Sequence, residues 1–136
     1  MDIYSIIADR PLTDPELVRQ VLRDTLRGPD TEPDLGFMLC DLNGRLVTPL
    51  LLAGLAPPTD PAQVRSLLDA TIGTLCRHGS VASYVVRHGP VHATAPDLQW
   101  QEAVQRYCAG TGVRDLGFFV VGTRGVDALP RLELVA

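Results

Sequence analysis

The chain has 136 residues, of which 46% are apolar and 5% aromatic, and it carries a formal net charge of −4 at neutral pH. This composition is typical of a globular domain with a sizeable core, while the acidic balance and the few aromatic residues disfavour nucleic acid as a partner. All 12 basic residues are arginines, which excludes chemistry that needs a lysine, such as a Schiff base or a Walker A loop.

The N-terminal part of the sequence predicts a short apolar strand over residues 3–8 and then a helix. Thr13 and Glu16 stand three residues apart, as in a capping box, where each side chain accepts the other residue's backbone N–H. Leucines and valines then recur at helical spacing and make one apolar face, which we expect to pack against a sheet. Glycine and proline at positions 28 and 29 predict the end of this helix.

A β-hairpin is predicted next. A buried strand over 35–40 leads to Asn43-Gly44, which is a strong hairpin signal because these residues tolerate the positive φ that a tight turn needs. The return strand over 46–52 contains Pro49. Because proline cannot donate a hydrogen bond to a neighbouring strand, Pro49 predicts that this strand is an edge strand or carries a bulge.

The second half of the chain predicts two further helices, each followed by a strand. One helix spans about residues 59–79 and leads to a strand over 81–87. The next helix spans about 94–108 and leads to a strand over 116–121, whose unbroken apolar run predicts a central place in the sheet. The last strand, over 126–135, returns toward the C-terminus and is interrupted by a proline.

The order β-α-β-β-α-β-α-β-β predicts an α/β fold, in which helices cover a mixed β-sheet. No low-complexity tract or linker interrupts the sequence, so residues 1–136 are expected to form a single compact domain. Within it, residues 1–33 would supply the N-terminal strand and helix, and residues 34–136 the core.

Residues 13–52 and 94–133 share one pattern, 81 positions apart without a gap. Both copies place a helix start before a hairpin, and Asp-Leu-Gly-Phe occurs at 34–37 and again at 115–118. The similarity can come from an old duplication or from the same caps and turns used twice, and the sequence leaves both explanations open.

Several features bear on the cellular compartment. The N-terminus lacks the basic and apolar regions of a signal peptide, and no apolar run is long enough to cross a membrane. The cysteines Cys40, Cys76 and Cys108 are widely spaced and show no Cys-x-x-Cys or zinc pattern. We therefore expect buried, reduced cysteines in a cytoplasmic protein that does not enter a membrane.

Residues 35–129 also resemble a known fold. A hairpin motif at 41–45 is followed by a helix, a strand that runs into a histidine-containing loop, Pro96-Asp97 at a helix start, and Val-Gly at 121–122. This order resembles the JAB/MPN metalloproteases and, among them, the RadC-like proteins. The resemblance covers about 95 of the 136 residues, rests on order and spacing, and implies a JAB-like core.

In the JAB family, two histidines spaced His-x-His and an aspartate hold zinc, and an earlier glutamate handles the proton of the metal-bound water. Three protein ligands leave one position open for water, whose pKa the metal lowers. In this chain His88 matches one histidine and Asp97 the aspartate, but the next histidine is His92, four residues on. The glutamate would fall near Pro33, beside Glu32. The resemblance therefore implies a scaffold with an incomplete metal motif.

The same element order is also similar to the cytidine-deaminase fold, whose His-x-Glu and Pro-Cys-x-x-Cys signatures are absent here. The leading hypothesis is a non-catalytic JAB-like domain without a cofactor, which acts through protein contacts or dimerisation. Its expected contact region is the loop that carries His88, His92 and Asp97, with Trp100 beside it. An exposed Trp100 would suit a protein partner or a second copy of the chain, whereas a buried one would belong to the core.

The alternative hypothesis is a metal-dependent hydrolase with a rearranged zinc site. It would use His88, His92 and Asp97 as ligands and Glu32 as a displaced base, which requires these four side chains to meet in one pocket. The simpler interpretation is a polar loop with exposed histidines and an aspartate that suits the helix dipole. A nucleotide- or nucleic-acid-linked role, by analogy with the same fold families, is disfavoured by the acidic charge.

Overall fold

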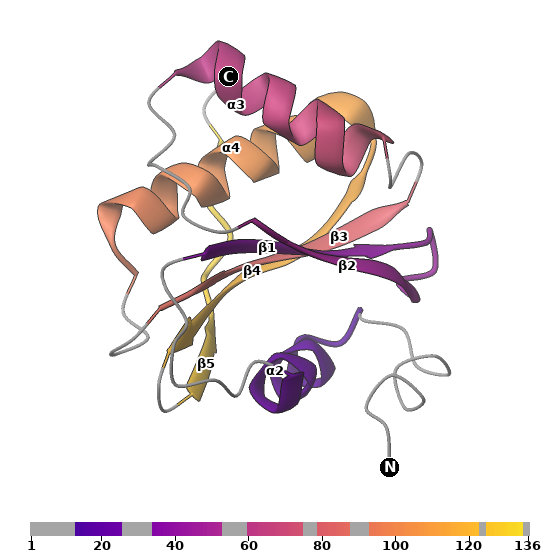
Figure 1. The fold of residues 1–136 in the computed structure, drawn as a ribbon, viewed down its shortest axis with the longest axis vertical. Helices are drawn as coiled ribbons and strands as arrows, with labels where there is room; N and C mark the ends of the chain where they lie inside the picture. The colour runs from indigo at the N-terminus through magenta and orange to yellow at the C-terminus, as the bar shows by residue number, and fades with distance from the viewer. Residues whose placement is uncertain are drawn as a thin grey trace.

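A mixed β-sheet forms the middle layer of the molecule (Figure 1). Within the described residues, five strands are arranged in the order β2-β1-β3-β4-β5; β3 and β4 are parallel, and the other neighbouring pairs are antiparallel. The strands are β1 Asp34–Cys40, β2 Leu46–Leu52, β3 Ser80–Val86, β4 Arg114–Gly122 and β5 Gly125–Ala128. The computed structural model describes residues 13–25, 34–52, 60–74, 79–87, 93–122 and 125–134.

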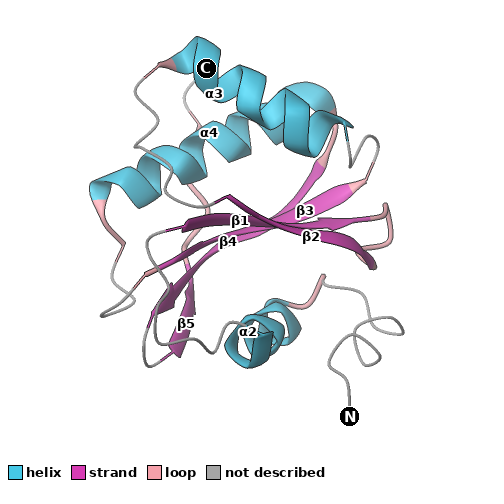
Figure 2. Ribbon diagram, viewed as in Figure 1, coloured by secondary structure: helices cyan, strands magenta, loops and turns pink. Residues whose placement is uncertain are grey.

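Helices cover both faces of this sheet (Figure 2). Helix α3 (Pro61–Leu68), its continuation η1 (Asp69–Gly73) and helix α4 (Ala95–Thr111) lie on one face, and α2 (Pro15–Thr25) lies on the other. Every residue of β3 is buried, because its side chains point alternately into the two layers. The predicted α/β fold with a helix-covered mixed sheet is confirmed, while the strand predicted over 3–8 lies outside the described residues.

The strand predicted over 116–121 is confirmed as an interior strand, although β3 lies in the middle of the strand order. The predicted strand corresponds to β4, which lies between β3 and β5. The unbroken apolar run in β4 reflects burial on both faces: Phe118 and Val120 pack toward α4, and Phe119 and Val121 pack toward α2. Continuous apolarity therefore predicts cover on both faces correctly but does not fix a strand's place in the order.

The predicted hairpin turn is present between β1 and β2. Gly44 has a φ of 84°, and the Asp41 carboxylate accepts the backbone N–H groups of Asn43 and Arg45, both at 2.9 Å. Strand β2 lies at the edge of the described sheet, and a bulge shifts its register against β1 near the turn. Both features agree with the interpretation of Pro49, whose missing N–H is tolerated in an edge strand.

The return strand predicted over 126–135 is shorter than expected. Strand β5 ends at Ala128, and the following residues leave the sheet and run along α4. Gln105 donates through Nε2 to the carbonyl of Leu132 at 2.6 Å and accepts the Leu132 N–H at 3.1 Å. Gln101 donates to the carbonyl of Pro130 at 2.8 Å. Since Pro130 has no N–H to give back, the buried Gln101 Oε1 has no partner among the described residues.

This difference between the two glutamines predicts different effects on stability. Replacing Gln105 with methionine, a side chain of similar length, is expected to lower the free energy of unfolding by about 1–2 kcal/mol, because both main-chain groups of Leu132 lose their partner. The matched variant Gln101→Met loses one bond but also removes a buried, unpaired oxygen, so its loss is expected to stay below about 1 kcal/mol. Urea unfolding compares the two variants, and equal losses would contradict this account.

The two halves of the sequence echo are not equivalent in three dimensions. Their hairpins flank β3, but β1 runs antiparallel to β3 and β4 runs parallel to it. If the two copies were related by a twofold rotation about the sheet normal, that rotation would exchange the hairpins and leave both helices on the same face of the sheet. Helices α2 and α4 instead lie on opposite faces. The shared glycine also differs, since Gly36 continues a regular strand and Gly117 lies at a bulge with a φ of 129°. These differences favour the same caps and turns used twice.

Candidate functional site

The described part of the predicted contact loop is the start of helix α4. Thr94 is the N-cap of this helix, and Asp97 is its third residue. The two residues form a capping box, in which the Thr94 backbone N–H donates to Asp97 Oδ2 at 2.8 Å and the Thr94 side chain accepts the Asp97 N–H. The local Thr-x-x-Asp pattern explains this geometry, because it satisfies backbone donors that the first helical turn leaves free.

Asp97 also forms an ion pair with Arg87, which directly follows β3. The two side chains are only 9% and 15% exposed, so the pair is largely withdrawn from water. Burial lowers the pKa of the Arg87 guanidinium, although an arginine remains charged in proteins. The backbone N–H of Arg87 donates to the carbonyl of Val121 at 3.0 Å, which fixes the base of the side chain at the end of the sheet.

The other residues of the predicted site are not placed by the structure. His88, His92 and Glu32 lie outside the described residues, so whether they approach Asp97 stays a prediction. Among the residues that are described, no three His, Cys, Asp or Glu side chains form a group that could hold a metal ion. Of the three cysteines, Cys40 and Cys108 are buried as expected, and Cys76 is outside the described ranges.

Trp100 lies one helical turn after Asp97 and points into the core. It is 6% exposed and belongs to the apolar cluster between the sheet and the helices α3 and α4, with Phe37 and Val85 among its members. The interpretation that Trp100 belongs to the core is therefore confirmed, and the alternative that it is an exposed anchor for a partner is wrong. A tryptophan three residues after a buried Asp97 shares its helix face, and here that face packs on the sheet.

The burial of Trp100 can be measured without a mutation, because it is the only tryptophan in the chain. Its fluorescence is expected to be blue-shifted relative to the unfolded protein and to be quenched weakly by iodide, since iodide reaches only exposed indole rings. Quenching in the folded protein as strong as in the urea-unfolded chain would contradict the placement of Trp100 in the core.

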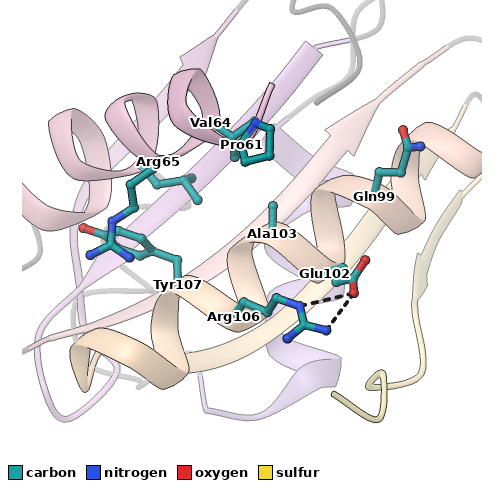
Figure 3. A pocket seen from close by; sticks show the side chains of 9 residues that line it. Pro61, Val64, Arg65, Gln99, Glu102, Ala103, Arg106 and Tyr107 are labelled. Atoms are coloured by element: carbon teal, nitrogen blue, oxygen red, sulfur yellow. Dashed lines mark hydrogen bonds and ion pairs between the residues drawn. The ribbon is translucent and has the colours of Figure 1, made fainter. Parts of the chain in front are cut away.

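A groove that the sequence did not predict lies between α3 and α4 (Figure 3). It has a volume of about 480 Å³, and both apolar and charged side chains line it. Val64, Leu68 and Ala103 are among the apolar lining residues. Arg106 and Glu102 form an ion pair one helical turn apart, with distances of 3.1 and 3.2 Å from the guanidinium to Glu102 Oε1.

At one end of the groove, three side chains form a linked cluster. The Arg65 guanidinium lies over the ring of Tyr107, 4.8 Å from its centroid. The Tyr107 hydroxyl donates to Asp69 Oδ1 at 2.7 Å, and Arg65 Nε lies 3.5 Å from Asp69 Oδ2. Burial, together with the hydrogen bond and charge of Asp69, raises the pKa of Tyr107 to about 12, so the phenol stays a donor at neutral pH.

Asp69, one member of this cluster, begins a π-helical turn, a feature that is uncommon and often found at functional sites. Helix α3 widens into this turn at η1, where a Cβ on Gly73 would overlap the Tyr107 hydroxyl. The hydroxyl of Thr71 donates to the Leu67 carbonyl at 2.8 Å, and that of Thr74 donates to the Asp69 carbonyl at 2.9 Å. The sequence signal was a glycine between poor helix formers at 71–74, inside a predicted helix.

No protein-family model matches the chain, and no curated protein matches it in sequence. The resemblance to JAB-like proteins therefore rests on the motifs of this chain. Within the residues that the structure describes, no helix combines the length and apolarity needed to cross a membrane.

Proposed function

We propose that the protein is a non-catalytic domain with a JAB-like (RadC-like) scaffold, which acts in the cytoplasm through protein contacts or dimerisation. The observation that carries this proposal is that Asp97, which matches the family's zinc-binding aspartate, already has partners within the chain. The Asp97 carboxylate is paired with Arg87 and accepts the Thr94 N–H. A metal ion at Asp97 would compete with a buried guanidinium of the same charge sign, which opposes metal binding.

Exposed apolar residues of the β1–β2 hairpin support a contact role. Leu42 in the turn and Val47 and Leu51 in β2 are the most exposed large apolar residues in the described part of the chain, together with Leu98 on α4. Apolar side chains gathered on one hairpin are typical of an interaction surface. Pro49 and the bulge interrupt the edge of β2, which favours side-chain packing over the addition of another strand. A second copy of this chain is the proposed occupant.

The metal content of the purified protein tests the non-catalytic proposal. The protein should be prepared without chelators and without a His tag, offered zinc, and analysed by mass spectrometry. Substoichiometric zinc is expected, together with no cleavage of peptide or isopeptide substrates. One bound zinc per chain with such cleavage would overturn the proposal and favour the hydrolase that uses His88, His92 and Asp97.

The oligomeric state tests the contact surface. We expect sedimentation velocity to show a concentration-dependent dimer, and we expect the double variant Val47→Ser, Leu51→Ser to shift it toward the monomer. Leu98→Ser is the matched control, because Leu98 is an exposed leucine on a different element and its loss should leave the dimer intact. A wild-type monomer at all concentrations, or an equal effect of the control, would contradict dimerisation through this hairpin.

A further inference from the structure

The groove between α3 and α4 has no part in the proposed contact role, yet it has the size and lining of a ligand site. Small-molecule sites usually measure about 300–1,000 Å³ and combine an apolar lining with a few fixed polar groups. This groove measures about 480 Å³, and its lining combines apolar side chains with the two arginines Arg65 and Arg106.

Arg65 is a polar side chain of the groove that its neighbours hold in place. Its guanidinium is held by the ring of Tyr107 and, through Nε, by Asp69. The terminal nitrogens of Arg65 have no hydrogen-bond partner among the described residues, and the side chain is 58% exposed. A guanidinium that is fixed on one side and open on the other is suited to bind a carboxylate through two parallel hydrogen bonds.

The charged side chains around Arg65 determine which ligand charge the groove favours. Asp69 is satisfied by the Tyr107 hydroxyl and by Arg65, and Glu102 is satisfied by Arg106. The raised pKa of Tyr107 agrees with a phenol that keeps its proton and donates it in the hydrogen bond to Asp69. One open guanidinium edge remains, which suits one negative charge.

We infer that this groove binds a small organic monocarboxylate with an apolar body. The carboxylate would pair with the terminal N–H groups of Arg65, and the apolar body would lie along Val64, Leu68 and Ala103. The Tyr107 ring and Asp69 act as positioning residues, because they hold Arg65 and do not contact the ligand's charge. The terminal nitrogens of Arg65 carry only hydrogen-bond donors, so they favour a carboxylate over a neutral or positively charged head group.

Titration with a matched pair of probes tests the ligand class. 4-Phenylbutyrate and its neutral counterpart 4-phenylbutanamide share the same apolar body and differ in the charged group. In ¹H–¹⁵N NMR spectra of the full chain, 4-phenylbutyrate is expected to cause saturable shifts confined to α3, η1 and α4. The amide is expected to bind about tenfold more weakly, because it cannot form the charge-assisted pair.

Two arginine variants assign the site. Arg65→Gln is expected to weaken 4-phenylbutyrate binding about tenfold, while Arg45→Gln, the same change on the β1–β2 hairpin, leaves it unchanged. The spectra also report whether each variant is folded. Equal binding of acid and amide, absence of saturable shifts, or wild-type affinity in Arg65→Gln would each overturn the inference. None of these outcomes bears on zinc content or dimerisation, so the proposed function is tested separately.

Discussion

Replacing Asp97 with alanine is expected to lower the free energy of unfolding by about 3–5 kcal/mol, the range found when one partner of a buried ion pair is removed. The loss arises because Arg87 keeps its charge in a largely buried position, where its Nε already has no partner among the described residues. The Thr94 N–H also loses its acceptor, which removes half of the capping box. Urea denaturation followed by circular dichroism measures the change.

Two further variants separate burial from charge. The double variant Arg87→Met/Asp97→Ala leaves no unpaired buried charge. About half or more of the free energy of unfolding that Asp97→Ala loses should therefore be recovered. Glu102→Ala breaks an ion pair that is half exposed on the same helix, and its cost is expected to stay below about 1 kcal/mol. A cost for Asp97→Ala no larger than that for Glu102→Ala would show that burial does not make the Arg87–Asp97 pair special.

The same variant also discriminates between the structural and the metal-binding roles of Asp97. If Asp97 serves only the ion pair and the helix cap, Asp97→Ala should lower the free energy of unfolding by the same amount with and without a chelator. If it were a zinc ligand, zinc would stabilise the wild-type chain and the gain would vanish in Asp97→Ala. The proposal of a non-catalytic domain requires the first result.

Replacing Gly36 with alanine is expected to lower the free energy of unfolding by about 2–3 kcal/mol, the upper range for overpacking of a core. Gly36 pairs with Tyr84 across β1 and β3, and an added Cβ would overlap the far end of the Tyr84 ring. That ring is itself buried within the α2 layer, so it cannot move aside without displacing its neighbours. Thermal and urea unfolding should both report the change.

Gly110→Ala is the control for this substitution, because nothing lies within 4 Å of an added Cβ at that position. Gly110 lies inside α4, where alanine is expected to stabilise the helix by about 0.5–1 kcal/mol. Combining Gly36→Ala with Tyr84→Ala should cost less than the sum of the two single losses, since the clash exists only when both side chains are present. Strictly additive losses would mean that Tyr84 is not the group that excludes a side chain at Gly36.

The features that sequence reasoning predicted well depend on neighbouring residues. The turn at Asn43-Gly44 and the start of a helix near Thr94, with Asp97 in its first turn, are set by contacts within four positions, and both are present. The partner of Asp97 could not be predicted in the same way. Arg87 reaches it because Arg87 directly follows β3 and the start of α4 lies beside that end of the strand.

Helix α4 shows why Trp100 could not be assigned from the pattern. Its buried face mixes apolar residues with Asp97, Gln101 and Gln105, so the contrast between faces that usually marks an amphipathic helix is weak. Each of these polar side chains has a hydrogen-bond partner remote in sequence, either Arg87 or the C-terminal segment. The groove was missed for the same reason, because Asp69 and Tyr107 meet across 38 positions.

The hydrogen bonds between α4 and the C-terminal segment determine how the sequence of that segment can vary. Gln101 and Gln105 form their hydrogen bonds with main-chain atoms of Pro130 and Leu132, so these bonds do not depend on which side chains stand there. Related chains could therefore differ widely at these positions and still follow the same path, provided that the glutamines remain and position 132 keeps its N–H. Proline should be the one residue rejected at position 132, although it is accepted two positions earlier.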